Sequence, residues 1–251
     1  MELNLANKRV IITGASKGIG KAIASAMAGE GAQLAICARG AESLNVTQKE
    51  LLENNIKVFS KACDVADKDQ LSDFLDESHA ALGGIDVLIN NTSGFGLTDD
   101  EEGWKAGIDV DLMASVRATQ KVIPWLEEAN GGSIIHVSSI SGMEAGSPPA
   151  YAAVKAALIN HAKTMAQELA AKNIRVNCVA PGSVWVEGGF WNIVKDNNRE
   201  MYDGVLANIP FGRLGSPEEI ADVITFLASE RASWVSGITM VVDGVQHKGI
   251  F

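Results

Sequence analysis

Short apolar segments rich in β-branched residues alternate with helical patterns along the whole sequence. The first segment, Arg9–Thr13, leads through a glycine-rich loop into apolar residues at helical spacing. Such short apolar runs are typical of strands buried on both faces of a parallel sheet. The remaining candidates are Leu34–Ala38, Ile56–Ala62, Asp86–Asn90, Ser133–Val137, Ile174–Val179 and Ile238–Val242. This alternation predicts an α/β fold with a doubly wound, mostly parallel sheet and helices on both faces.

We expect residues 1–251 to form a single domain, because no linker, repeat or low-complexity tract interrupts the alternation. The irregular insertion at about residues 187–210 carries large apolar residues among charged ones: Phe190, Trp191, Met201 and Tyr202. It is predicted to be a mobile helical flap over the carboxyl edge of the sheet, where ligands bind in this architecture. Its aromatic residues, with Trp185, either line an apolar pocket or pack the flap itself.

Three residue pairs match the capping-box pattern of a helix start: Asp67 with Gln70, Thr98 with Glu101, and Ser216 with Glu219. The second pair predicts a long helix that runs through Trp104 to about Pro124. A further helix is predicted from Tyr151 to about Ala171.

Composition excludes several classes of protein. The formal net charge of −10 argues against nucleic acid and anionic membranes as general partners. No apolar run is long enough for a membrane span, and the N-terminus lacks a secretion-signal pattern. The three cysteines are far apart in apolar runs, which indicates reduced thiols in a cytoplasmic protein. The four histidines have no metal-ligand spacing, so no metal site is predicted.

The loop after the first strand is Gly14-Ala15-Ser16-Lys17-Gly18-Ile19-Gly20. Strand, glycine loop and helix together can present backbone N–H groups and a helix N-terminus to a phosphate. The spacing is GxxxGxG instead of GxGxxG, and a purely structural turn remains the alternative.

The end of the second strand bears on the choice of cofactor. In dinucleotide-binding folds a carboxylate there binds the adenosine ribose and disfavours a 2′-phosphate. Here Ala38 is followed by Arg39, and Lys17 adds a second cation from the glycine loop. Two cations without a carboxylate favour NADP(H) over NAD(H), unless both are simply solvated loop charges.

Tyr151 and Lys155 lie four residues apart and therefore share one face of a helix. A free phenol has a pKa near ~10, and a nearby ammonium lowers it by favouring the phenolate. The pair is thus a candidate proton donor or acceptor, although the same spacing occurs by chance on solvated helices.

The chain resembles the short-chain dehydrogenase/reductase family over its whole length, in particular the branch of 3-oxoacyl-ACP reductase-like proteins. The resemblance rests on motifs in the family's order: Thr13-Gly14-x-x-x-Gly18-x-Gly20, Asp64-Val65, Asn90-Asn91, Ser138-Ser139, Tyr151-x-x-x-Lys155 and Pro181-Gly182. It implies a Rossmann-type sheet, a nicotinamide dinucleotide, a small carbonyl or alcohol substrate and a homotetramer. The usual subunit contacts would be the long helices from about Asp100 and Tyr151.

The resemblance also implies roles for individual residues. Tyr151 would exchange a proton with the substrate oxygen, Lys155 would lower the tyrosine pKa and hold the nicotinamide ribose, and Ser139 would bind the substrate oxygen. The residues implied in cofactor binding are Gly14, Ser16, Lys17, Gly18, Ile19, Gly20, Arg39, Asp64, Val65, Asn91, Tyr151, Lys155, Pro181, Gly182 and Val184.

The sequence departs from the family pattern in several places. Asp111 stands at the fourth catalytic position, where asparagine is usual, so an amide donor is lost. The strand register points to Ser139 as the catalytic serine, whereas the usual spacing to the tyrosine points to Ser138. Residues 90–94 read Asn-Asn-Thr-Ser-Gly instead of Asn-Asn-Ala-Gly, and the threonine common after Pro-Gly is absent from residues 183–186.

Two classes of function follow. The favoured one is an NADP(H)-dependent carbonyl reductase or alcohol dehydrogenase. The alternative is a dinucleotide-binding sensor or scaffold without turnover, because a fold does not fix a function. Ser139, Tyr151 and Lys155 favour the enzyme, whereas Asp111 favours the alternative.

Overall fold

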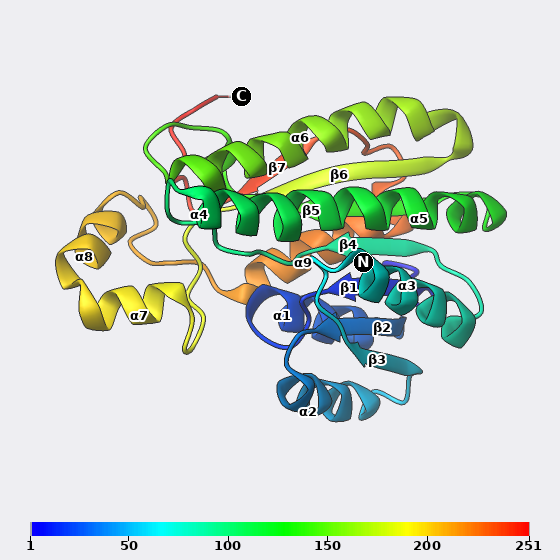
Figure 1. The fold of residues 1–251 in the computed structure, drawn as a ribbon. Helices are drawn as coiled ribbons and strands as arrows, with labels where there is room; N and C mark the ends of the chain where they lie inside the picture. Colours follow the sequence, from blue (N-terminus) through cyan, green and yellow to red (C-terminus); the bar gives the residue numbers. More distant parts are fainter. Residues whose placement is uncertain (1, 251) are drawn as a thin grey trace.

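A computed structural model describes residues 2–250 and shows a seven-stranded sheet with helices on both faces (Figure 1). The strand order is β3-β2-β1-β4-β5-β6-β7, and every neighbouring pair is parallel. The predicted doubly wound sheet is confirmed, and it is parallel throughout. The order reverses between β1 and β4, so the chain leaves these adjacent strands toward opposite ends of the sheet.

The strands agree closely with the apolar segments of the sequence. Their bounds are β1 Arg9–Thr13, β2 Gln33–Ala38, β3 Val58–Ala62, β4 Val87–Asn90, β5 Gly132–Val137, β6 Ile174–Pro181 and β7 Thr239–Val242. The third strand thus begins two residues later than predicted, and the sixth continues through Pro181. Alternate residues of β1 enter different cores: Val10 and Ile12 pack on one face, and Ile11 packs on the other.

Helices cover both faces of the sheet. The α-helices are α1 Gly18–Gly29, α2 Ala41–Leu52, α3 Lys68–Leu82, α4 Glu101–Ala106, α5 Ala114–Glu128, α6 Pro149–Leu169, α7 Phe190–Asn197, α8 Arg199–Ala207 and α9 Pro217–Ala228. Buried side chains of α1, α2 and α9 pack with Val10 on one face of the sheet. Those of α3, α5 and α6 pack with Ile11 on the other face.

The predicted helix from Thr98 to about Pro124 needs two corrections. Asp100, not Thr98, is the N-cap: its carboxylate accepts the Gly103 N–H, and the Thr98 hydroxyl donates to Asp100. The helix also continues to Glu128, because Pro124 is tolerated inside α5. Between α4 and α5 the chain forms a π-helix, Gly107–Met113, a feature found mostly at functional sites.

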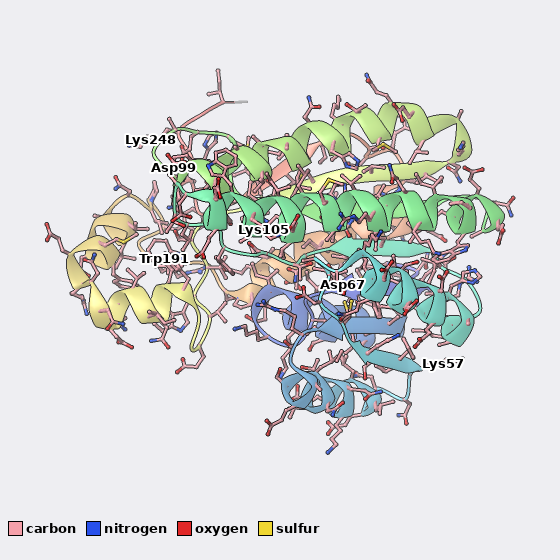
Figure 2. The ribbon with its side chains drawn as sticks, in the orientation of Figure 1. Lys57, Asp67, Asp99, Lys105, Trp191 and Lys248 are labelled. Carbon is pink, nitrogen blue, oxygen red and sulfur yellow. The ribbon has the colours of Figure 1, made fainter. Side chains whose placement is uncertain are left out.

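The other two helix starts are largely as predicted. Ser216 and Glu219 form a reciprocal capping box at the start of α9. Asp67, which Figure 2 labels at the start of α3, accepts the N–H groups of Asp69 and Gln70. The Gln70 side chain does not return to the Asp67 N–H, as a capping box requires, but accepts the Asp64 N–H instead.

The irregular insertion contains α7 and α8, which stand beside the end of the sheet where the chain leaves β6 (Figure 1). Trp185, just before the insertion, packs edge to face with Tyr202 of α8, and the Lys195 ammonium lies 5.0 Å from the Trp185 ring centroid. These two aromatic residues therefore pack the insertion itself. Within residues 2–250, no helix combines the length and the apolar character that a membrane crossing requires.

Arg9, the first residue of β1, holds the start of β4 in place. Asp86 accepts hydrogen bonds from the Arg9 backbone N–H, Nε and Nη2 at 2.7–2.8 Å. Burial alone would raise the pKa of Asp86, but the hydrogen bonds and charge of Arg9 outweigh it and hold that pKa below its ordinary value.

We expect Asp86→Asn to lower the free energy of unfolding at pH 7 by about 2 kcal/mol, the scale of a charged hydrogen-bonding group. Because the pKa is depressed in the folded state, this stability is present above about pH 4 and is lost as pH falls through the folded-state value. Urea unfolding at neutral and acidic pH should show a smaller acid-induced loss in the variant than in the wild type. Asp76→Asn, which removes only the exposed pair with Lys121, should cost less than about 1 kcal/mol.

Candidate functional site

The glycine loop between β1 and α1 leaves a helix N-terminus without a side-chain cap. Gly14 and Gly18 adopt positive φ angles of 71° and 56°, which favour glycine. A Cβ on Gly20 would collide with the Gly14 carbonyl oxygen, so the loop and helix approach closely. No side chain accepts the first N–H groups of α1, and its first turn has no acidic residue. This cradle suits an anionic group such as a pyrophosphate.

Asn91, directly after β4, joins this loop to the neighbouring strand. Its backbone N–H donates to the Thr13 hydroxyl at 3.0 Å, and its side-chain amide donates to the carbonyls of Thr13 and Gly14, both at 3.1 Å. The asparagine therefore fixes the crevice between β1 and β4, where open α/β sheets bind ligands.

The two cations predicted to select the cofactor, Lys17 and Arg39, are both exposed. No hydrogen bond or ion pair engages either side chain within residues 2–250. Arg39 follows the end of β2, next to the buried Ala38. Both are therefore free to meet an anion at this edge of the sheet.

Asp64 and Val65 follow β3. The Asp64 carboxylate accepts the Ala66 N–H at 3.1 Å, and Val65 is buried. After β6, Gly182 lies so close to Asp243 that no larger residue fits, and Val184 forms a bridge with Gly215. These contacts fix the loops that follow β3 and β6 at the carboxyl edge.

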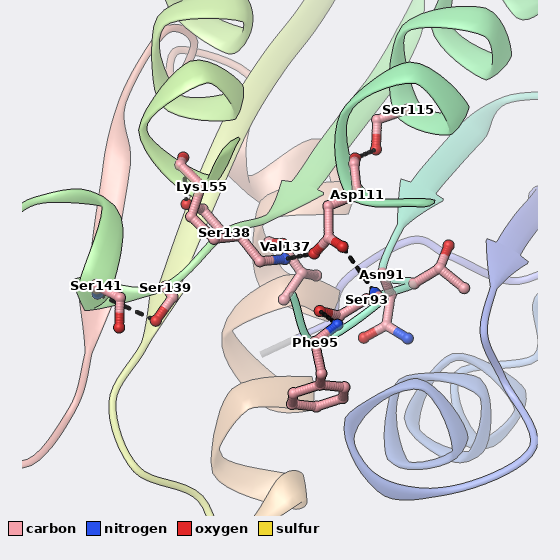
Figure 3. Close-up of polar contacts among 12 residues, drawn as sticks. Asn91, Ser93, Phe95, Asp111, Ser115, Val137, Ser138, Ser139, Ser141 and Lys155 are labelled. Atoms are coloured by element: carbon pink, nitrogen blue, oxygen red, sulfur yellow. Dashed lines mark hydrogen bonds and ion pairs between the residues drawn. The ribbon is translucent and has the colours of Figure 1, made fainter. Parts of the chain in front are cut away.

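Lys155, which Figure 3 labels beside Asp111, is almost completely buried, with 2% of its side chain exposed. It lies one turn after Tyr151 on α6. Its Nζ lies 5.6 Å from the centroid of the Tyr151 ring and donates to the Val137 carbonyl at 3.1 Å. Tyr151 is half-buried. The lysine of the predicted Tyr151–Lys155 pair is thus bound to the last residue of β5.

Asp111, in the π-helix, provides the counter-charge for Lys155. The carboxylate is fully buried, and its Oδ1 lies 2.8 Å from the lysine Nζ. Its Oδ2 accepts the Gly94 N–H at 2.7 Å. Burial alone would lower the pKa of Lys155, but attraction by Asp111, and then by Tyr151, raises it above the ordinary value. Lys155 is therefore a charged, paired ammonium.

The two serines after β5 have different surroundings (Figure 3). The Ser138 hydroxyl is buried and donates to the Lys155 carbonyl at 2.8 Å, so it ties β5 to α6. The Ser139 hydroxyl accepts the Ser141 N–H at 3.1 Å. Within residues 2–250 the Ser139 hydroxyl has no acceptor for its own hydrogen, which leaves it available as a donor.

Sequence reasoning missed three partners of these residues. The Thr13 hydroxyl, the Gly94 N–H and the Val137 carbonyl hold Asn91, Asp111 and Lys155 respectively. Only Thr13 carried a sequence signal, as a polar residue that ends an apolar strand; the other two partners are backbone groups, which no residue type identifies.

Phe95 is a fourth unpredicted feature. Its φ of 48° is unusual for a bulky residue, and 55% of the residue is exposed. Its ring is parallel to that of Tyr151 at a centroid distance of 6.4 Å and to that of Phe190 at 6.5 Å. Phe190 in turn meets Trp191 edge to face. An aromatic row therefore leads from Tyr151 to α7.

Comparison with known proteins identifies the family of the chain. Residues 14–245 match the family model described as enoyl-(acyl carrier protein) reductase. The chain is 40% identical to a 3-oxoacyl-[acyl-carrier-protein] reductase of Thermotoga maritima, with 96% of this chain and 98% of the relative covered.

Two solved structures have the same fold over nearly their whole length. L-sorbose reductase from Gluconobacter frateurii, complexed with NADPH and L-sorbose, superposes with a TM-score of 0.91 at 33% identity, with 100% of each chain covered. A 7α-hydroxysteroid dehydrogenase, complexed with NADH and 7-oxo glycochenodeoxycholic acid, gives 0.91 at 31% identity, with 100% of this chain and 98% of that chain covered. The match over residues 14–245 and these relatives establish that the chain belongs to the short-chain dehydrogenase/reductase family of oxidoreductases, in its 3-oxoacyl-ACP reductase-like branch.

Proposed function

We propose that this protein is an NADP(H)-dependent oxidoreductase that interconverts a ketone or aldehyde and the corresponding alcohol. The observation that carries the proposal is a half-buried phenol beside a buried ammonium that is bound to the end of β5. The same carboxyl edge of the sheet carries a serine hydroxyl free to donate, directly after β5, and an uncapped helix N-terminus after β1. Relatives named as reductases and dehydrogenases support it.

The residues of the chain have distinct roles in this proposal. When bound, the dinucleotide supplies or takes up the hydride. Tyr151 exchanges a proton with the substrate oxygen, and the Ser139 hydroxyl donates a hydrogen bond to that oxygen. Ser138 is the positioning residue, because its hydroxyl is already engaged by the Lys155 carbonyl. Lys155 binds the nicotinamide ribose, and its ammonium lies 5.6 Å from the centroid of the Tyr151 ring.

The dinucleotide lies along the carboxyl edge in this proposal. The residues that hold it are Gly14, Ser16, Lys17, Gly18, Ile19, Gly20, Arg39, Asp64, Val65, Asn91, Tyr151, Lys155, Pro181, Gly182 and Val184. Lys17 and Arg39 provide the preference for the 2′-phosphate of NADP(H), because both are exposed and unpaired within residues 2–250. The relatives in complexes include one with NADPH and one with NADH, so the preference rests on these two cations.

Replacing the cation after β2 tests this preference. Arg39→Ala should weaken NADPH binding by about tenfold, the scale of one charged hydrogen bond, and leave NADH binding nearly unchanged. Lys49→Ala, which removes an exposed cation from α2, is the matched control. Fluorescence titration with NADPH and with NADH gives the ratio of the two dissociation constants for each variant. A wild-type protein that binds NADH more tightly than NADPH contradicts the proposal.

Removing one hydroxyl tests the acid–base role. Tyr151→Phe should leave the fold and NADPH binding intact, because the ring still packs, and should lower kcat by at least ~100-fold. Tyr202→Phe, which changes the only other tyrosine, should keep wild-type turnover. Activity is read as loss of NADPH absorbance with a panel of ketones.

The same assay separates the two classes of function. A protein that binds NADPH but reduces no member of the panel would be a sensor or scaffold. Wild-type kcat in Tyr151→Phe would instead remove the tyrosine from the mechanism.

The aromatic row beside Tyr151 indicates that the substrate carries an apolar body. A strained conformation at an exposed phenylalanine is best explained by function, because folding alone does not favour it. The Phe95 ring then packs against the part of the substrate next to the reacting carbonyl, and Phe190 extends this contact toward α7.

Truncation of Phe95 tests this contact. Phe95→Ala should raise KM for ketones with an aromatic or long aliphatic group by about tenfold, because a buried apolar contact is lost. KM for a small ketone such as acetone should change less. Equal changes for both ketones would rule out a specific role for the ring. Ile193→Ala, which truncates an exposed apolar side chain of α7, is the control.

Three further features stay predictions. They are the mobility of residues 187–210 as a flap, the cytoplasmic location, and the homotetramer with contacts through the helices from Asp100 and Tyr151. None of them is needed for the chemistry proposed here.

A further inference from the structure

We propose that Asp111 is a positioning residue that neutralises Lys155, keeps the Tyr151 phenol protonated and so adapts the site to carbonyl reduction. This inference rests on the proposed function and deepens it. It concerns the direction of the reaction, which the roles of Tyr151 and Ser139 leave open.

The charges of Lys155 and Asp111 are paired with each other and shielded from solvent. Lys155 and Asp111 have 2% and 0% of their side chains exposed, and their charged atoms lie 2.8 Å apart. The remaining contacts are to uncharged backbone: Lys155 to the Val137 carbonyl, and Asp111 Oδ2 to the Gly94 N–H. Within residues 2–250, Asp111 Oδ1 makes no hydrogen bond to any other group, so the ammonium is its sole partner.

Among residues 2–250, no other carboxylate pairs with this ammonium. His136 approaches from β5, but burial lowers its pKa to about 3, so it is neutral at pH 7. Cys178 approaches from β6, and burial raises the pKa of its thiol to about 12, so it is neutral as well. On α6, burial lowers the pKa of His161 against an opposing effect of Glu168, and the His161 ring shares a hydrogen bond with His136 at 3.1 Å. The net charge beside the Tyr151 phenol therefore depends on whether the Asp111 carboxylate is present to pair with Lys155.

That charge governs the proton on Tyr151. An unpaired ammonium favours a neighbouring phenolate, whereas an ion pair has no net charge and favours it much less. An asparagine at residue 111 would remove the carboxylate that compensates this ammonium, so the positive charge that Lys155 carries beside the ring would be unpaired. With aspartate there, the phenol keeps its proton to a higher pH.

A protonated phenol is the form that reduction uses. In that direction the carbonyl carbon gains the hydride of the reduced dinucleotide, and the carbonyl oxygen gains the Tyr151 proton, which leaves a phenolate and an oxidised dinucleotide. In the reverse direction the phenolate must be present first, to accept the alcohol proton. Asp111 thus favours carbonyl reduction at neutral pH and shifts the onset of alcohol oxidation to alkaline pH.

The test is the pH profile of Asp111→Asn in both directions. The pH of half-maximal kcat for alcohol oxidation should fall by about one unit, since removal of a nearby charge shifts a titration by one unit or more. The alkaline decline of ketone reduction should move down by the same amount. Asp109→Asn, which removes an equal charge from the same π-helix where Asp109 pairs with the exposed Lys105, should leave both profiles in place. Unchanged profiles in Asp111→Asn would overturn the proposal.

A spectroscopic titration gives a readout without turnover. The chain has only two tyrosines, Tyr151 and Tyr202, so the near-ultraviolet absorbance of tyrosinate in Tyr202→Phe reports on Tyr151 alone. Adding Asp111→Asn to this variant should lower the midpoint pH of the tyrosinate titration by about one unit. Loss of activity in Tyr151→Phe together with an unmoved midpoint here would refute the role of Asp111 but leave the proposed function standing.

A double variant covers the case in which Asp111→Asn alone fails to fold. Asp111→Asn with Lys155→Gln replaces the ion pair by a neutral pair and leaves no uncompensated buried charge. If the native pair acts as a neutral unit, the tyrosinate midpoint of the double variant stays within about half a unit of the wild-type value. A rise of a full unit or more would show that Lys155 acts as a net cation despite Asp111, and would overturn the proposal.

Discussion

The reversal of strand order between β1 and β4 is the constraint on which the site depends. Because these adjacent parallel strands send the chain toward opposite ends of the sheet, their two loops separate at the carboxyl edge. Asn91 spans this gap through three hydrogen bonds to Thr13 and Gly14. The asparagine therefore fixes the glycine loop relative to the loop that carries Gly94, and through Gly94 relative to Asp111.

The buried ion pair extends this fixed region to the other half of the sheet. Lys155 comes from α6, Asp111 from the π-helix and Val137 from β5, so the contacts of one ammonium join three elements. A buried pair contributes little net stability, since desolvation offsets the attraction, but loss of one partner costs about 3–5 kcal/mol. The pair is therefore better explained by the geometry that it imposes on α6, the π-helix and β5 than by stability.

The sequence predicted the sheet and the main candidate residues because both depend on local patterns. Apolar runs predicted the strands within a few residues, the i,i+4 spacing predicted the Tyr151–Lys155 pair, and the resemblance to the family pattern pointed to Asp111. What was not predicted depends on three-dimensional contacts. Asp100 replaces Thr98 as N-cap although both residue types can cap. The ion pair joins residues 44 positions apart, and the φ of Phe95 follows from the course of its loop.

The site divides into two halves that differ in the kind of force that holds them. Hydrogen bonds and one ion pair fix Ser139, Lys155 and Asp111, and such directional contacts tolerate little change. Beside them, the Phe95 ring stacks on Phe190, and the Phe190 ring meets Trp191 edge to face. Such ring contacts can change without loss of a hydrogen bond. Relatives with this fold act on a sugar in one case and a steroid in another. Under the proposed function, the aromatic half is therefore the part of the site where substrate range can change without loss of a directional contact.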